Sequence, residues 1–334
     1  MKKTIASSLV IGLFLALCLF PGLGIFLLGE SQPAANEQLA PRPRWGLSVL
    51  NESADWLADH FALRQDLVTL WARLNAAVGT STEEQVLLGR EGWLYYAPTL
   101  PDYSGEHLSD EELERIALRL ASLQADAEQA GMRFVFTVAP NKNTLYPDAM
   151  PSWAKAEHGN GNLSRLQPRL EAHGIRYVDL SGIPMPYYRT DSHWTAEGAA
   201  MAADALLAAL DRQSSYAAGP FREEGLHRGD LYEMLYPAAR GAEPEIVYAE
   251  LLQYESLNDT RGGNAITIRT ASSEGTGRLY CWRDSFGIAL YPYLADSFAE
   301  AVFSRSRNYQ IPDGEYDVLI LEIVERNLPE LLAE

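Results

Sequence analysis

The sequence is poor in cysteine and in positive charge. It contains 2 cysteines in 334 residues, Cys18 in an apolar N-terminal run and Cys281 far downstream, so it offers neither a disulfide framework nor a cysteine-rich zinc site. Its 27 lysines and arginines are outnumbered by 45 aspartates and glutamates, which gives a formal net charge of -18. A surface of this sign repels phosphate backbones, and we therefore exclude nucleic acid as a partner.

One long hydrophobic run lies at the N-terminus. Lys2 and Lys3 precede an apolar stretch from Ile5 to Leu28, and Glu30 follows it. At 1.5 Å per residue, a helix of this length crosses a hydrocarbon core of about 30 Å. We therefore predict one transmembrane helix in an N-terminal membrane anchor at 1–30. The positive-inside rule then places the rest of the chain on the periplasmic or extracytoplasmic side of the cytoplasmic (inner) membrane. A cleaved signal peptide is the alternative.

The remaining sequence divides into a spacer and one folded domain. Residues 31–48 are polar and contain Pro33, Pro41 and Pro43, a composition typical of an extended linker. Residues 49–334 follow as a single domain, because 47% of the chain is hydrophobic and this length buries one large core. Within that domain, residues 214–276 show no clean hydrophobic period, and we interpret them as an insertion over the sheet.

The rest of the domain alternates between helix and strand patterns. A capping box formed by Ser109 and Glu112 marks one helix start. The expected elements are an amphipathic helix at 54–77, a hairpin at 86–96, helices at 109–131, 163–172, 196–210 and 286–298, and strands at 133–138, 176–180, 278–282, 301–304 and 316–324. This alternation predicts a three-layer α/β fold, in which a parallel sheet has helices on both faces. Reactive groups in such folds gather at the carboxyl ends of the strands.

Ser285 follows one of these strands directly. The segment Arg283-Asp284-Ser285-Phe286-Gly287 joins the strand at 278–282 to an apolar helix, so Ser285 is expected on a strand-to-helix turn with its hydroxyl exposed at the sheet edge. Backbone N–H groups of the first helical turn then point at a developing oxyanion. Helix capping by Ser285 or Asp284 is the alternative. Cys281 is a rival nucleophile, but it falls within the strand, and we interpret it as a core residue.

Asp191 and His193 supply the groups that a serine nucleophile needs. They stand in the segment Asp191-Ser192-His193-Trp194-Thr195, between a predicted strand and a predicted helix. An imidazole takes the serine proton, and a carboxylate two residues away fixes the imidazole tautomer. A helix N-cap pair or a metal half-site is the alternative, although no third or fourth metal ligand is evident. His107, His158 and His227 are expected in polar loops without an adjacent partner.

Other side chains are weaker candidates for substrate or oxyanion contacts. Asn141 and Lys142 follow the strand at 133–138, where an amide can donate to an oxyanion and an ammonium can hold an anionic group; a solvated turn is the alternative. Trp194 is a candidate for lining an acyl or sugar site, or a packing residue. Arg326, beside Glu325 at the end of the last strand, braces the site through an ion pair or belongs to a surface pair.

Several of these segments together resemble one family. WLADHFALR, GREGWLYY, VAPNKNTLYPDAMP, DSHWTAEGA, RDSFG with PYLADSFAE, and DVLILEIVERNL are similar to the SGNH-hydrolase-like polysaccharide O-acetyltransferases of the alginate (AlgJ and AlgX) type and their DHHW-motif relatives. The likeness covers nearly all of the chain after the N-terminal run. Two positions depart from the pattern: Ser192 stands in the DHHW motif where a histidine is usual, and Arg283 stands where a glycine commonly precedes Asp-Ser.

The resemblance implies a fold, an activity and a set of catalytic residues. The fold is an SGNH-hydrolase-like, flavodoxin-like α/β sandwich whose motifs are circularly permuted, so that the triad occurs in the order Asp191, His193, Ser285. The activity is O-acetylation of an exported polysaccharide through an acetyl-serine, without a bound cofactor. A membrane-bound O-acyltransferase is the implied partner that delivers the acetyl group. Arg283 precedes the nucleophile and is a further candidate for the oxyanion site. A carbohydrate acetylesterase using the same triad and a non-catalytic envelope scaffold remain alternatives.

Overall fold

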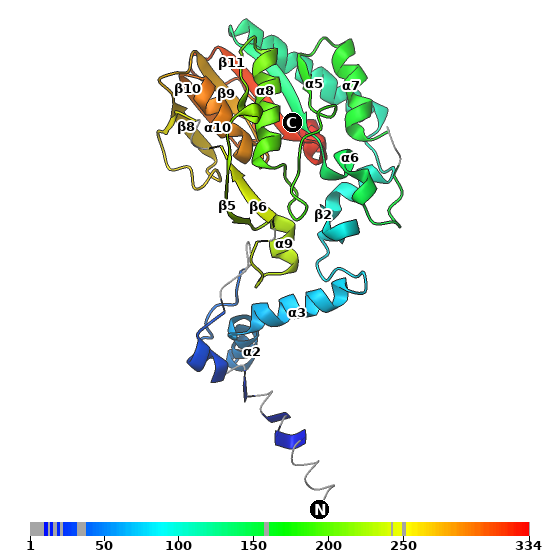
Figure 1. Ribbon diagram of the computed structural model, residues 1–334, viewed down its shortest axis with the longest axis vertical. Helices are drawn as coiled ribbons and strands as arrows, with labels where there is room; N and C mark the ends of the chain where they lie inside the picture. Colours follow the sequence, from blue (N-terminus) through cyan, green and yellow to red (C-terminus); the bar gives the residue numbers. More distant parts are fainter. Residues whose placement is uncertain are drawn as a thin grey trace, which may run out of the picture. The chain divides into compact units, whose positions relative to one another are not determined.

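The computed structural model describes residues 10–12, 14–15, 19–20, 23–31, 38–156, 160–241, 243–248 and 252–333 (Figure 1). Among these residues, no helix has both the length and the apolar character that crossing a bilayer requires. Cys18, His158 and parts of the predicted anchor and linker lie outside the described residues.

The chain forms two compact units. The first comprises residues 1–86 and 230–241, and the second comprises residues 87–229 and 242–334. The helices of the first unit include α2 (Val49–His60), α3 (Arg64–Ala76) and α9 (Asp230–Leu235), and residues 23–28 are helical as well. The single helix predicted at 54–77 is wrong, because the chain leaves helical geometry at Phe61, which has φ -66° and ψ 139°. Apolar spacing does not reveal the break, since both helices carry apolar residues at helical intervals.

The second unit is built on a seven-stranded sheet in the order β4-β3-β11-β9-β10-β8-β7. Its strands are β3 (Arg133–Ala139), β4 (Tyr177–Asp179), β7 (Glu255–Ser256), β8 (Thr267–Ala271), β9 (Arg278–Trp282), β10 (Glu300–Ser304) and β11 (Val318–Val324). The five strands predicted from the sequence pair in parallel. The prediction of a wholly parallel sheet is wrong, because β8 and β7 pair antiparallel at one edge.

Helices cover both faces of this sheet. On one face, α5 (Asp110–Gln129) and α7 (Asn162–Ala172) pack against alternate residues of β3 and β11. On the other, α8 (Ala196–Ala209) and α10 (Gly287–Ser297) pack on the intervening residues (Figure 1). All seven residues of β11 are buried, as expected for a central strand covered on both faces. Cys281 of β9 lies in the second core, and burial raises the pKa of its thiol well above the usual value, which confirms it as a core residue.

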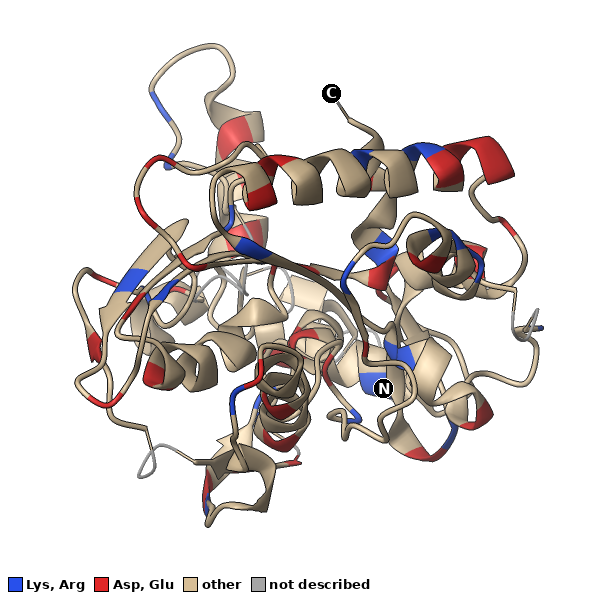
Figure 2. Ribbon diagram, turned by 90° about the horizontal axis from the view of Figure 1, so that it is seen from above, with Lys and Arg blue, Asp and Glu red and all other residues tan. Residues whose placement is uncertain are grey.

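The described chain also contains smaller elements, four of which precede β4. They are β1 (Val86–Leu88), β2 (Leu94–Tyr96), α4 (Leu100–Tyr103) and α6 (Lys142–Leu145). The predicted hairpin at 86–96 is present as β1 and β2. The predicted capping box is present as well: Ser109 Oγ accepts from the N–H of Glu112, and the Glu112 carboxylate accepts from the N–H of Ser109. Acidic residues are spread over helices and loops rather than gathered in one place (Figure 2).

The segment at 214–276 contributes to the sheet instead of only lying over it. Its β8 and β7 extend the sheet beyond β10, and the Asn258 side chain continues the edge by donating to Thr267 O and accepting from the N–H of Arg269. Its β5 (Arg222–His227) and β6 (Glu243–Val247) form a separate antiparallel pair. These strands are short and polar, which is why hydrophobic periodicity does not reveal them.

Candidate active site

Asp191, His193 and Ser285 meet at the carboxyl edge of the sheet. Ser285 lies between β9 and α10, and the other two residues lie between β4 and α8. His193 Nε2 is 2.9 Å from Ser285 Oγ, and His193 Nδ1 is 2.7 Å from Asp191 Oδ1. With Asp191 accepting from the Nδ1–H, the Nε2 lone pair faces the serine hydroxyl, which is the geometry for activating a nucleophile. The contact expected between positions 193 and 285 is therefore present.

The turn that carries Ser285 is fixed through Asp284. One Asp284 oxygen accepts from the N–H of Phe286 at 2.9 Å, and the other accepts from the N–H of Val324, at the end of β11, at 2.7 Å. The N–H of Asp284 donates to Glu322 Oε2 at 3.2 Å. Burial raises the pKa of Glu322 well above its usual value. Asp284 thus connects the turn that carries Ser285 to the central strand β11. Helix α10 begins directly after this turn.

The segment that carries Asp191 is fixed by Lys142 and by the start of α8. Lys142 Nζ donates to the carbonyl oxygens of Leu94, Arg189 and Asp191 at 2.6, 2.7 and 2.9 Å. Lys142 is only 4% exposed, so its ammonium does not lie where the predicted contact with an anionic substrate group requires it. Gly198 lets α8 start close to this segment, because any side chain at position 198 would place its Cβ 2.5 Å from Pro186 O.

His227 belongs to the same network, and the expectation of a loop histidine without a partner is wrong. His227 Nε2 is 2.8 Å from Asp191 Oδ2, and His227 Nδ1 is 2.6 Å from Glu245 Oε2. Burial lowers the pKa of His227, but the hydrogen bonds and charges of Asp191 and Glu245 outweigh it and raise that pKa to about 9. No local signal marks this residue, because its partners are 36 and 18 positions away in the sequence.

The pKa of Asp191 is held well below its usual value. Burial raises it, but hydrogen bonds from His193 and His227 to its two oxygens outweigh the burial. The ring nitrogens of His193 face Asp191 and Ser285, and those of His227 face Asp191 and Glu245. All four ring nitrogens of the two histidines therefore have side-chain hydrogen-bond partners.

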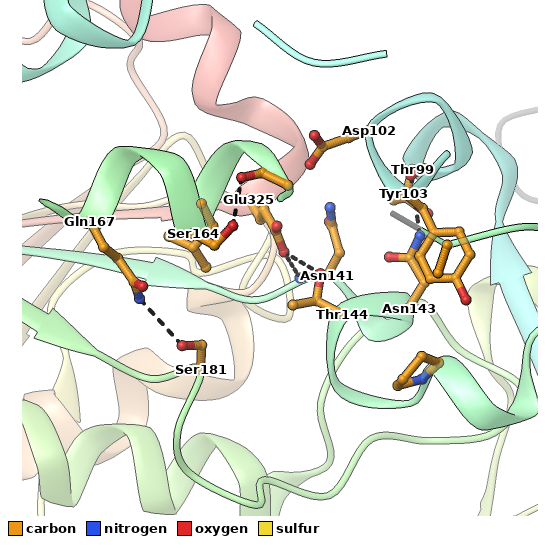
Figure 3. A pocket seen from close by; sticks show the side chains of 14 residues that line it. Thr99, Asp102, Tyr103, Asn141, Asn143, Thr144, Ser164, Gln167, Ser181 and Glu325 are labelled. Atoms are coloured by element: carbon orange, nitrogen blue, oxygen red, sulfur yellow. Dashed lines mark hydrogen bonds between the residues drawn. The ribbon is translucent and has the colours of Figure 1, made fainter. Parts of the chain in front are cut away.

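Among the described residues, the hydrogen bonds of Asn141 and Arg283 go to groups other than the Ser285 hydroxyl. Asn141, 2% exposed, lines a cavity of about 140 Å³ together with Glu325, whose Oε2 accepts from the N–H of Asn141 at 2.7 Å and from Thr144 Oγ1 at 2.7 Å (Figure 3). The buried guanidinium of Arg283 donates to Gly263 O at 2.7 Å and Ala265 O at 3.1 Å. Arg283 therefore ties the nucleophile's turn to the segment before β8 instead of facing the oxyanion, whereas the substrate contact expected of Asn141 stays a prediction, in a cavity that Ser285 does not line.

Trp194 and Arg326 lie beside the nucleophile's neighbour Phe286. Trp194, 1% exposed, donates from Nε1 to Phe286 O at 3.2 Å. The Arg326 guanidinium lies 5.3 Å from the Phe286 ring centroid and 5.2 Å from that of Tyr96. The predicted pairing of Arg326 with Glu325 is replaced by these ring contacts, which attract the cation to the aromatic faces.

A largely apolar cavity of about 430 Å³ opens in front of Ser285 and His193. Its walls come from the segment before α8, from β6 and the residues after it, and from α10. The aromatic and aliphatic residues in these walls include Tyr188, Trp194, Ile246, Tyr248, Tyr254, Phe286, Pro292 and Tyr293. Such a cavity, with the reactive hydroxyl at its wall, is typical of a substrate site.

A protein-family model matches part of the chain. The model of the SGNH hydrolase-like domain of the acetyltransferase AlgX matches residues 86–260, just over half of the chain. The chain belongs to this family. The match includes Asp191 and His193 and ends before Ser285. The choice of Ser285 as the nucleophile therefore depends on the geometry described above.

Curated relatives of this AlgX-family chain carry the name of probable alginate O-acetylases. A probable alginate O-acetylase AlgJ of Pseudomonas fluorescens is 26% identical over 62% of this chain and 56% of its own length. The Pseudomonas aeruginosa counterpart is 28% identical over 52% of this chain and 47% of its own length. The chain thus spans about half the length of these relatives.

Solved structures share the fold at low identity. Bacillus cereus PatB1 has a TM-score of 0.57 and 16% identity, covering 73% of this chain and 96% of that one. A DHHW family protein from Eubacterium siraeum has a TM-score of 0.53 and 14% identity, covering 74% and 97%. Together with the family match, they show an SGNH-like α/β fold.

Proposed function

We propose that this protein is a serine-dependent O-acetyltransferase that acts on an exported cell-envelope or extracellular polysaccharide. The observation that carries the proposal is the His193 imidazole, which lies within hydrogen-bond distance of both Ser285 Oγ and Asp191 Oδ1. Membership of the AlgX acetyltransferase family and the resemblance to alginate O-acetylases support acetyl transfer to a glycan.

The reaction proceeds in two steps. In the first, His193 Nε2 takes the Ser285 proton while Oγ attacks the acetyl carbonyl of the donor; the donor's bond to that carbon breaks, and its leaving group receives the proton from His193. In the second, a sugar hydroxyl gives its proton to His193 and attacks the acetyl-serine, and Ser285 recovers a proton as its ester bond breaks. Asp191 stabilises the imidazolium in both steps. The N-terminus of α10 stabilises the oxyanion.

The surroundings of Ser285 suit a glycan acceptor. Tyrosine side chains combine an apolar ring with a polar tip, and Tyr188, Tyr248, Tyr254 and Tyr293 line the cavity. Its volume of about 430 Å³ accommodates a sugar unit beside an acetyl group. We place the protein at the cytoplasmic membrane with its catalytic unit facing the periplasm, where an exported polysaccharide is accessible and a membrane-bound O-acyltransferase supplies the acetyl donor.

Hydrolysis competes with transfer at the same serine. The His193 side chain is 25% exposed, so water also reaches the acetyl-serine, and esterase activity uses the same residues. The acceptor's occupancy of the cavity decides between the two outcomes.

Replacing Ser285 tests the function directly. We expect Ser285→Ala to lose acetyl transfer by at least about a thousandfold, because the attacking oxygen is gone. The exposed Ser306 provides the matched control, and Ser306→Ala should keep wild-type activity. The measurement is mass-spectrometric detection of acetyl-Ser285, followed by its rate of release with and without added oligosaccharide.

The release rates separate the alternatives. Faster release with oligosaccharide, and recovery of acetylated sugar, support the transferase. Release by water alone at the same rate supports the esterase. Unchanged polysaccharide acetylation in cells carrying Ser285→Ala contradicts the catalytic assignment and favours the scaffold.

A further inference from the structure

The pair of strands β5 and β6 reaches the Asp191 carboxylate from the side opposite His193. His227 ends β5, and Glu245 lies in β6. His227 Nε2 is 2.8 Å from Asp191 Oδ2, whereas His193 Nδ1 is 2.7 Å from Asp191 Oδ1. Each oxygen of the carboxylate is thus bound by a different imidazole.

Besides Asp191, two side chains hold the His227 ring, those of Glu245 and Tyr188. Its Nδ1 is 2.6 Å from Glu245 Oε2. Its ring stacks on Tyr188 with centroids 3.7 Å apart and an interplanar angle of 9°. The Tyr188 hydroxyl donates to the other Glu245 oxygen at 3.3 Å. The arrangement fixes the ring plane and its donor direction, as outer-sphere partners do in other catalytic sites.

A second residue of β6 holds the backbone beside Asp191. The Glu243 carboxylate accepts from the N–H groups of Arg189 and Thr190, each at 2.7 Å. The strand pair therefore binds both the side chain of Asp191 and the backbone that carries it.

We propose that His227 and Glu245 are positioning residues of the catalytic centre, which extends as a chain of hydrogen bonds Glu245–His227–Asp191–His193–Ser285. The inference rests on the proposed function and deepens it. His227 fixes the Asp191 carboxylate so that Oδ1 faces His193, and Glu245 fixes His227. Both residues line the cavity in front of Ser285, but their hydrogen bonds go to Asp191, to Tyr188 and to each other rather than to His193 or Ser285. The segment at 214–276 thus completes the catalytic machinery as well as walling the substrate cavity.

The protonation states along this chain of hydrogen bonds agree with the proposed positioning role. The pKa of His227 is raised to about 9 and that of Asp191 is held well below its usual value, so an imidazolium lies between two carboxylates. Tyr188, the other ionisable group against the ring, has a raised pKa because it is buried and faces Glu245. It therefore stays neutral.

Two substitutions at His227 distinguish the effect of its hydrogen bond to Asp191 from the effect of its packing on Tyr188. His227→Phe keeps a ring that stacks on Tyr188 but donates nothing to Asp191. We expect kcat to fall roughly 10–100-fold, the range for losing a hydrogen bond to a charged group, with KM within about twofold. His227→Gln places an amide N–H near Asp191 and should recover most of kcat. The rate at which a sulfonyl fluoride modifies Ser285 should fall by the same factor as kcat, because activation of the nucleophile is what is lost.

His173 provides the matched control. His173 follows the last residue of α7, and its Nε2 is 2.6 Å from Oε1 of Glu114 in α5. It therefore forms an imidazole–carboxylate pair outside the network. His173→Phe and His173→Gln should leave kcat and the modification rate unchanged. Thermal unfolding of every variant shows whether it folds.

The outcomes distinguish this inference from the proposed function. If Ser285→Ala abolishes transfer but folded His227→Phe keeps kcat within about twofold, the positioning role is wrong and the triad stands. If His227→Phe does not fold, Glu245→Leu tests the proposal instead. A fall in kcat of roughly 3–10-fold at constant KM supports the positioning role of Glu245 and His227. An unchanged kcat contradicts it. If Ser285→Ala itself is active, the proposed function fails first.

Discussion

At the scale of single residues, buried polar groups organise the carboxyl edge of the sheet. Asp191 and Asp284 each accept hydrogen bonds from a near neighbour and from a distant segment, and Glu325 accepts two from the distant segment 141–144. Each therefore joins segments that are distant in the sequence. Two of these carboxylates hold the predicted triad, whereas Glu325 ties the end of β11 to the segment after β3.

Glu325 gives a pH dependence of stability that one substitution removes. Burial raises the pKa of Glu325 to about 7, above its unfolded value, so its stabilising contribution is present below the unfolded pKa and is lost as pH rises through the folded pKa. Glu325→Gln stays neutral and still accepts from Asn141 and Thr144. Between about pH 5 and about pH 8 we expect the variant to gain about 2 kcal/mol of unfolding free energy relative to wild type. Urea unfolding at both pH values measures it, and a wild-type-like pH dependence contradicts the assignment.

At the scale of elements, the sequence predicts the parts of the fold whose signals are local. Each parallel strand is a short apolar run, and α5 begins at a capping box, so both are visible in the pattern. Ser285, Asp191 and His193 are also visible, because each stands between a strand and a helix. The separation of α2 from α3, the edge strands β7 and β8, and the partners of His227 are not visible. They depend on tertiary contacts or on polar strands that periodicity does not detect.

Lys142 joins three elements, and its replacement should affect both stability and catalysis. Its ammonium donates to carbonyl oxygens in β2 and in the 189–191 segment, which Lys142→Met leaves without this donor. We expect a loss of about 2–4 kcal/mol in unfolding free energy and a lower kcat, because the Asp191 backbone loses an anchor. Lys155, which is exposed, is the control, and Lys155→Met should change neither quantity. Equilibrium unfolding and initial rates provide the comparison; a stable Lys142→Met variant refutes the anchoring role.

At the scale of the whole molecule, the formal net charge of -18 bears on the acceptor. A polyanionic glycan is repelled by a strongly acidic protein, and salt screens that repulsion over a Debye length of about 10 Å at about 0.1 M ionic strength. Under the proposed function, added salt should lower KM several-fold for an anionic oligosaccharide and leave KM for a neutral one unchanged. Initial rates across a sodium chloride series measure this. If salt changes KM equally for the two acceptors, the net charge of the protein does not influence which acceptor it binds.

The edge of the sheet at β7 also affects how the protein behaves at high concentration. Open strand edges invite pairing with another chain, and proteins commonly blunt them with very short strands and polar side chains. Here β7 has two residues, both exposed and polar, and the Asn258 amide already occupies backbone groups of β8. The chain therefore offers little template for intermolecular β-pairing at this side, which protects it from aggregation by strand addition.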